Sequence, residues 1–145
     1  MRYLPEALES IFNQTVQDFE IIIIDNGSTD GTVEYVRDNF PAITLLRNMR
    51  NLGFAHGHNQ AIRLALNRWQ DRELENNFVL VTNQDIILRK DFLEKIITAA
   101  DGAPRAASFG GKLFKAFFTT AEDNIEDSIK SDTLDSTGLR CFKSH

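Results

Sequence analysis

Apolar and polar residues alternate along the chain in blocks that predict strands and helices in turn. Short apolar runs that end at turn residues predict strands over 19–24, 43–46 and 78–82, with a further short strand over 106–109. Apolar residues at helical spacing predict helices over 5–14, from Thr32 to the stop at Pro41, over about 62–69, and after a cap at Asp91. Strands that alternate with helices indicate an α/β fold with a parallel or mixed sheet.

The segment IIIIDNGSTDGT, residues 21–32, joins the first strand to a helix through a polar turn. Its continuous apolar run predicts a strand buried on both faces. Asp25 then lies at the carboxyl end of the strand, the edge at which α/β sheets bind ligands. Residues 28–30 are candidate caps for the helix that Thr32 begins. Taken alone, the segment is equally well explained as a well-made strand-to-helix turn.

A second polar strand end, Asn83-Gln84-Asp85, follows the apolar residues 78–82. If the strands are parallel, Asp25 and Asp85 emerge at the same edge. Two carboxylates there would repel a phosphate-bearing ligand, and a divalent cation that bridges the oxygens removes the conflict. Mg²⁺ or Mn²⁺ suits such ligands. In the alternative, Asp25 accepts hydrogen bonds from a base or sugar hydroxyls and leaves the metal to Asp85.

The loop NMRNLGFAHGHN, residues 48–59, is a third candidate for ligand contact. Its candidate residues, with the arginine before it, are Arg47, Arg50, Asn51, Gly53, Gly57 and Asn59. His56 and His58, two positions apart on a helix, would not share a face, which favours loop or substrate-contacting roles over metal ligation. The plain alternative is a loop that leads into a helix.

Composition sets the class of protein. At 145 residues the chain is one domain, and its net charge of −5 argues against a nucleic-acid partner. Cys141 is the single cysteine, which excludes an intramolecular disulfide and fits a reducing compartment. The longest apolar run is too short to span a bilayer, and the first residues lack a signal-peptide pattern; peripheral membrane association stays open.

Together these segments resemble the family 2 glycosyltransferases of the GT-A fold, from about Leu4 to about Gly138. Four blocks carry the resemblance: SIFNQT followed by FEIIIIDNGSTDGT, RNLGFAHGHNQAI, VLVTNQDIILRKDFL, and FGGKLF with DSTGL. The pattern NLGFAxGxN with Asn-x-Asp most resembles the rhamnosyltransferase-like branch. The resemblance implies a Rossmann-like nucleotide-diphospho-sugar transferase fold, with a mixed, mostly parallel sheet flanked by helices and without the usual first strand.

The resemblance also implies a donor site. Its nucleotide-sugar-binding residues would be Asp25, Ser28, Asp30, Asn51, Gly53, Asn59, Asn83 and Gln84. Asp25 would contact the base, with Ser28 and Asp30 shaping that pocket. Asp85 would ligate Mg²⁺ or Mn²⁺ on the donor pyrophosphate. Asn83 stands where the family more often has an aspartate, which implies coordination through Asp85 alone, with water and phosphate completing the shell.

By the same resemblance, residues 1–120 form the nucleotide-sugar-binding part and residues 121–145 begin a loop-rich acceptor-side region. The chain begins after the family's first strand and ends before the segment that carries the family's catalytic carboxylate. Asp135 in DSTGL is favoured as a structural or acceptor-side residue, so no base is assigned. We expect a fragment with unpaired strand edges to be marginally stable or to form homo-oligomers through its strands.

The function implied is metal-dependent, inverting transfer of a sugar from dTDP-rhamnose or a UDP-sugar to a saccharide or lipid-linked saccharide acceptor. Such an enzyme would serve surface polysaccharide or cell-wall biosynthesis, in the cytoplasm or at the inner face of the plasma membrane. Two alternatives stay open. One is a non-catalytic nucleotide-binding remnant, and the other is a nucleotidyltransferase, whose basic, glycine-rich phosphate loop is not visible in this sequence.

Overall fold

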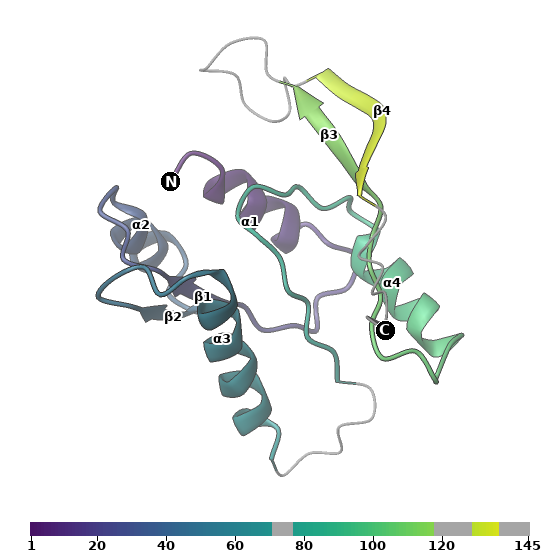
Figure 1. Cartoon of the computed structure of the whole chain (residues 1–145), viewed down its shortest axis with the longest axis horizontal. Coiled ribbons are helices and arrows are strands. Elements are labelled where there is room, and N and C mark those ends of the chain that lie inside the picture. Colours follow the sequence, from purple (N-terminus) through teal and green to yellow (C-terminus); the bar gives the residue numbers. More distant parts are fainter. Residues whose placement is uncertain (71–76, 118–128, 137–145) are drawn as a thin grey trace, which may run out of the picture. The chain divides into compact units, whose positions relative to one another are not determined.

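The computed structural model describes residues 1–70, 77–117 and 129–136 (Figure 1). The chain divides into two compact units. The first comprises Met1 and Asp18–Asn83, and the second comprises Arg2–Gln17 and Gln84–His145. The elements in chain order are α1 Leu4–Phe12, β1 Ile22–Asp25, α2 Thr32–Asn39, β2 Thr44–Arg47, α3 Phe54–Arg68, α4 Phe92–Asp101, β3 Leu113–Phe117 and β4 Ile129–Ser136.

The first unit is built on a parallel strand pair with helices against it. β1 and β2 pair in register, with Ile22 opposite Thr44 and Asp25 opposite Arg47. The intervening helix α2 packs on β2, and α3 runs beside β1 (Figure 1). This strand–helix–strand arrangement confirms the expected α/β class with parallel strands flanked by helices.

The core of the first unit comes from the apolar stripe of α2. Val33 and Val36 lie three positions apart, so they share one face, and each is 1% exposed. Burying each side chain contributes roughly 1.5–3 kcal/mol. The isoleucines at 21–24 are only half-buried, although their continuous apolar run predicts burial on both faces. In the described part of the chain β1 has one strand neighbour, β2, and a two-stranded sheet leaves part of its surface uncovered.

The third buried strand, expected over 78–82, does not form in the described structure. Phe78, Val79, Leu80 and Val81 are between 43% and 50% exposed, and no described strand pairs with them. An apolar run becomes a buried strand only where a neighbour binds its backbone N–H and C=O groups. The strand expected over 106–109 is likewise absent, and β3 begins later, at Leu113.

The second unit contains α1, α4 and an antiparallel pair. β3 and β4 pair with Phe117 opposite Ile129, and an ion pair joins the Lys115 Nζ and Asp135 Oδ1 atoms at 3.4 Å. β4 shows that residues 129–136, within the region 121–145 expected to be loop-rich, form a strand. The remainder of 121–145, like most of the charged stretch 70–77, lies outside the described residues.

Gln14, in the sequence NQT after α1, fastens α1 to the start of α4. The residue is 3% exposed. Its Nε2 donates to the carbonyl of Arg89 at 2.9 Å, and its Oε1 accepts the N–H of Leu93 at 3.0 Å. Asp91 is the N-cap residue of α4, as expected, but its side chain accepts no hydrogen bond from a backbone N–H of the helix. Its carboxylate instead binds Lys95 at 2.6 Å, and the hydrogen bond from that ammonium lowers the pKa of Asp91.

Candidate functional site

Asp25 is the last residue of β1, and its carboxylate is buried in the protein. Its side chain is 1% exposed, and Arg47 Nε lies 3.6 Å from Oδ2. The backbone N–H of Ser28 donates to both carboxylate oxygens, at 3.1 and 3.3 Å. A buried charge requires such partners, and they tie the turn 26–28 to the strand end. Arg47, a candidate phosphate ligand from the sequence, is therefore engaged with the turn, where it also donates to the Ser28 carbonyl at 3.4 Å.

Gly27 brings this turn against the loop that follows β2. Its φ of +88° lies in the left-handed region, which side chains disfavour. A Cβ atom at this position would lie 3.0 Å from the Cα of Arg50. Both the backbone conformation and the close approach therefore require glycine here.

Asp30 supplies the polar contact at the start of α2. Its carboxylate accepts the Thr32 N–H at 3.2 Å and the Thr32 hydroxyl at 2.5 Å, and it also binds the amino terminus of Met1. Hydrogen bonds from the amino terminus and from Thr32 lower the pKa of Asp30 to about 2. Among the three candidate caps, Asp30 is thus the one that binds a helix amide, although Gly31 holds the N-cap position.

Three side-chain amides connect β1, β2 and α3. Asn48 and Gln60 exchange two hydrogen bonds, with Asn48 Nδ2 to Gln60 Oε1 at 2.8 Å and Gln60 Nε2 to Asn48 Oδ1 at 3.0 Å. Asn48 Nδ2 also donates to Asn26 Oδ1 at 2.9 Å. Asn26 Nδ2 in turn donates to the carbonyl of Gly53 at 3.2 Å. We call Asn26, Asn48 and Gln60 the amide bridge.

The loop into α3 places the other predicted residues at its surface. Gly53 is the N-cap residue of α3 with φ +88°, and its N–H is bound by Asn51 Oδ1 at 2.8 Å. Asn51 and Asn59 are both exposed. His58 Nδ1 lies 2.9 Å from the Phe54 carbonyl, and the rings of His58 and Phe54 make a tilted contact, with centroids 4.0 Å apart and planes 39° apart. The His58 ring therefore has its partner in Phe54, one turn earlier in the same helix.

The second predicted strand end has a different character. Asn83, Gln84 and Asp85 are all exposed, and the last two lie in a turn. Asp85 thus offers a solvent-facing carboxylate, the hard oxygen donor that Mg²⁺ takes together with phosphates and water. Within the described ranges, no three His, Cys, Asp or Glu side chains gather into a metal-binding cluster. The convergence of Asp25 and Asp85 on one cleft stays a prediction.

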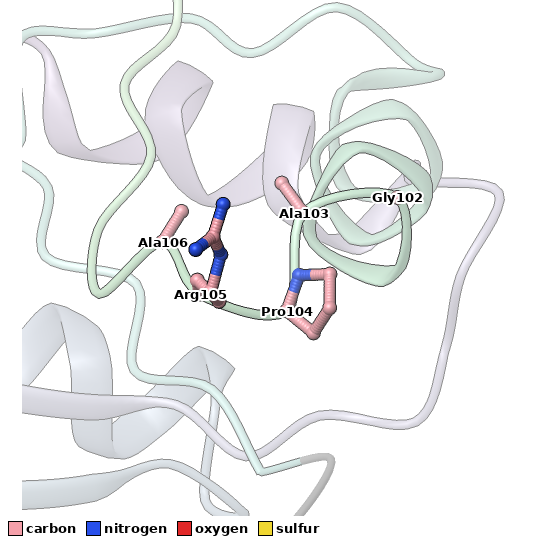
Figure 2. A pocket seen from close by; sticks show the side chains of 5 residues that line it. All are labelled: Gly102, Ala103, Pro104, Arg105 and Ala106. Atoms are coloured by element: carbon pink, nitrogen blue, oxygen red, sulfur yellow. The ribbon is translucent and has the colours of Figure 1, made fainter.

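A surface hollow after α4 contains none of the predicted residues. Its lining residues are Gly102, Ala103, Pro104, Arg105 and Ala106 (Figure 2). Among the described residues that line this hollow, Arg105 carries a charge and none is a carboxylate.

Comparison with known proteins identifies the family. The sequence model described as "Glycosyl transferase family 2" matches residues 2–129. The chain belongs to this family. The family 2 resemblance drawn from the four sequence blocks is therefore confirmed, and the turn 25–30 and the loop 48–59 lie inside the matched region.

Three curated glycosyltransferases that align with most of this family 2 chain share 28–29% of the aligned residues with it. An N-acetylglucosaminyl-diphospho-decaprenol L-rhamnosyltransferase of Mycobacterium tuberculosis is 29% identical over 115 residues, covering 74% of this chain and 36% of the relative. An uncharacterized glycosyltransferase of Bacillus subtilis, YfnE, is 29% identical over 125 residues, covering 84% and 29%. One from Haemophilus influenzae is 28% identical over 115 residues, covering 77% and 33%. The chain spans about a third of the length of these relatives. No described helix of this family member is long and apolar enough to cross a membrane.

Sequence reasoning missed the amide bridge. In the structure Gln60 lies three positions after the buried Gly57, so both lie on the face of α3 that is turned toward β1. A glutamine on the inward face of a helix needs a polar partner. The sequence alone did not say that Asn48 would be that partner.

Proposed function

We propose that this chain is the donor-binding part of a metal-dependent, inverting glycosyltransferase. The enzyme transfers a sugar from a nucleotide-diphosphate sugar to a saccharide acceptor. The observation that carries the proposal is the hydrogen-bonded edge at the carboxyl ends of β1 and β2, inside the region matched to family 2. Polar groups held in place at this edge suit a ligand that is rich in hydroxyl and phosphate oxygens.

The residues assigned to the donor divide by their environment. Asp25, assigned to contact the base, also holds the turn, because its carboxylate oxygens are bonded to the Ser28 N–H and lie near Arg47. The other residues assigned to contact the nucleotide or its sugar are Ser28, Asp30, Asn51, Gly53, Asn59, Asn83 and Gln84. All of these except the half-buried Ser28 are exposed.

Asp85 is assigned to hold Mg²⁺ or Mn²⁺ against the donor pyrophosphate. When bound, the cation neutralises charge on the leaving diphosphate. The exposed carboxylate of Asp85 supports this role, and Asn83, a neutral neighbour, leaves Asp85 as the charged ligand of the motif. Phosphate oxygens and water would complete an octahedral shell.

The donor and acceptor are proposed by analogy with the relatives. The mycobacterial relative is named a rhamnosyltransferase acting on a decaprenol-linked sugar, which favours dTDP-rhamnose over a UDP-sugar and a lipid-linked saccharide acceptor. We place the reaction in surface polysaccharide or cell-wall biosynthesis, in the cytoplasm or at the inner face of the plasma membrane, and we propose a homo-oligomer as an alternative to the monomer.

Calorimetric titration with UDP and dTDP, with and without Mn²⁺, tests the donor assignment. We expect Mn²⁺-dependent binding of at least one nucleotide. Asp85→Ala should remove the dependence on Mn²⁺, and Asp38→Ala, an exposed carboxylate change on α2, should leave it unchanged. Absence of binding under every condition would overturn the proposal. Binding without any sugar transfer by the full-length protein would instead favour a nucleotide-binding module.

A further inference from the structure

The amide bridge uses nearly all of the hydrogen-bonding capacity of its central residue. Asn48 Nδ2 donates to Asn26 Oδ1 and to Gln60 Oε1, and Asn48 Oδ1 accepts from Gln60 Nε2. Asn26 Oδ1 also accepts the Leu52 N–H at 3.5 Å. Because donors and acceptors alternate around the cluster, each amide is held in a single orientation.

The amide bridge joins three segments that contain residues predicted to bind the nucleotide-sugar donor. Asn26 belongs to the turn after β1, Asn48 begins the loop after β2, and Gln60 lies in α3. The bond from Asn26 to the Gly53 carbonyl fastens the far end of the loop. Residues 48–53 are therefore anchored at both ends, at Asn48 and at Gly53.

The three side chains of the bridge are half-buried, so their first role is to position the loop. A polar surface loop of this kind would otherwise sample many conformations, and fixing its backbone in one of them costs conformational entropy. A loop ordered before the ligand arrives spares that cost at the moment of binding.

We propose that Asn48 and Gln60 are positioning residues for the donor nucleotide. They hold the loop 48–53 against the turn 26–28 in the arrangement that binds the donor. This inference rests on the proposed function, and its test includes a measurement that needs no nucleotide.

The Gln60→Glu substitution tests the bridge through pH. When the new carboxyl group is ionised it cannot donate to Asn48 Oδ1, so we expect amide hydrogen exchange of residues 48–53 at pH 8 to be about tenfold faster than in the wild type, since one hydrogen bond is worth up to about that factor. The Kd for the bound nucleotide should rise about tenfold as well. At pH 4, just below the ordinary glutamate pKa of about 4.3, more than half of the carboxyl groups carry a proton and can donate again. Both quantities should then return toward wild-type values measured at the same pH.

Two further variants serve as comparisons. Asn67→Asp makes the same amide-to-acid change on α3, where Asn67 is exposed and bonded to Gln70 at 3.3 Å. It should alter neither exchange nor affinity. Gln60→Met removes both bonds to Asn48 without adding a charge, and should give a loss that does not depend on pH. It also replaces Gln60→Glu if that variant unfolds at pH 8.

The outcomes separate this inference from the proposed function. Unchanged hydrogen exchange of residues 48–53 in both Gln60 variants would show that the amide bridge does not order this loop. Faster exchange with an unchanged Kd overturns its role in donor binding. If the wild-type chain binds neither UDP nor dTDP, the proposed function fails and the positioning role falls with it, while the exchange data still report separately on the loop.

Discussion

The polar residues at the ends of β1 and β2 have partners within the protein, whereas the polar residues 83–85 face solvent. Asp25 is 1% exposed and bound by the Ser28 amide and by Arg47, and the amide bridge extends these contacts to α3. Asp85 is exposed at a turn. Both carboxylates follow an apolar run. Asp25 thus stabilises a turn within the protein, whereas Asp85 is free to bind a ligand from solvent.

The role of a carboxylate at a predicted strand end therefore depends on whether that strand forms. β1 pairs with β2, so Asp25 is drawn under the turn and bonded there. Residues 78–82 pair with no described strand, and the residues after them stay at the surface. Changes in the first region should therefore alter stability, and changes at 83–85 should alter ligand binding alone.

The largest effect is expected from Gly27→Ala in the turn of the first region. The left-handed φ of +88° and the 3.0 Å approach of the Arg50 backbone should together cost about 3 kcal/mol of unfolding free energy. Gly31→Ala is the matched control, because its φ is +83° and nothing lies within 4 Å, so strain alone should cost about 1 kcal/mol. Urea denaturation measures both, and equal losses would show that the turn does not press on Arg50.

A smaller loss is expected from Gln14→Leu, which tests the contact between the end of α1 and the start of α4. The carbonyl of Arg89 and the N–H of Leu93 would lose their buried partner, at a cost of about 2 kcal/mol. Hydrogen exchange of the Leu93 amide should accelerate. Gln17→Leu, a change at an exposed glutamine of the same segment, should cost much less. Comparable losses from the two variants would contradict the anchor.

Asp25→Asn and Asp85→Asn compare the two carboxylates directly. Asp25→Asn weakens the bonds from the Ser28 amide and Arg47 and should cost about 1.5 kcal/mol in stability. Asp85→Asn, at an exposed position, should change stability by less than about 0.5 kcal/mol. Thermal and urea unfolding of both variants decides the point. A large stability loss from Asp85→Asn would show that Asp85, like Asp25, has partners that stabilise the fold.

The smallest effect concerns Asp30 and pH. Its pKa is lowered from 3.8 to about 2 in the folded chain, mainly by the hydrogen bond from the amino terminus and then by Thr32. A depressed carboxyl pKa stabilises the fold above the unfolded value, and this contribution is lost as pH falls through the folded value. The difference in Tm between wild type and Asp30→Asn should therefore shrink between pH 4 and about pH 2.

N-terminal acetylation is the control for this prediction. Removing the amino-terminal charge should raise the pKa of Asp30 toward its ordinary value, as read by NMR titration, because the largest cause of its depression is lost. A depressed pKa that survives acetylation would assign the effect to Thr32 instead.

Local pattern predicted the helices well and the strands unevenly. The apolar spacing around Val33 and Val36 and the stop near Pro41 located α2, since a helix satisfies its backbone hydrogen bonds within one segment. The apolar run at 78–82 suggested a strand, yet a strand depends on a partner that its own residues cannot supply. β4, in a weakly patterned polar stretch, forms because β3 pairs with it.

The candidate site divides in the same way. The sequence identified Asp25, the glycine turn and the loop 48–53, because these depend on local chemistry at a strand end. It could not foresee that Gln14 would bind the start of α4, or that Asn48 and Gln60 would bind each other. The family and the helices could thus be predicted from the sequence. The pairing of buried polar side chains was decided by tertiary structure, because a buried amide must bond to whichever group the fold brings within 3 Å of it.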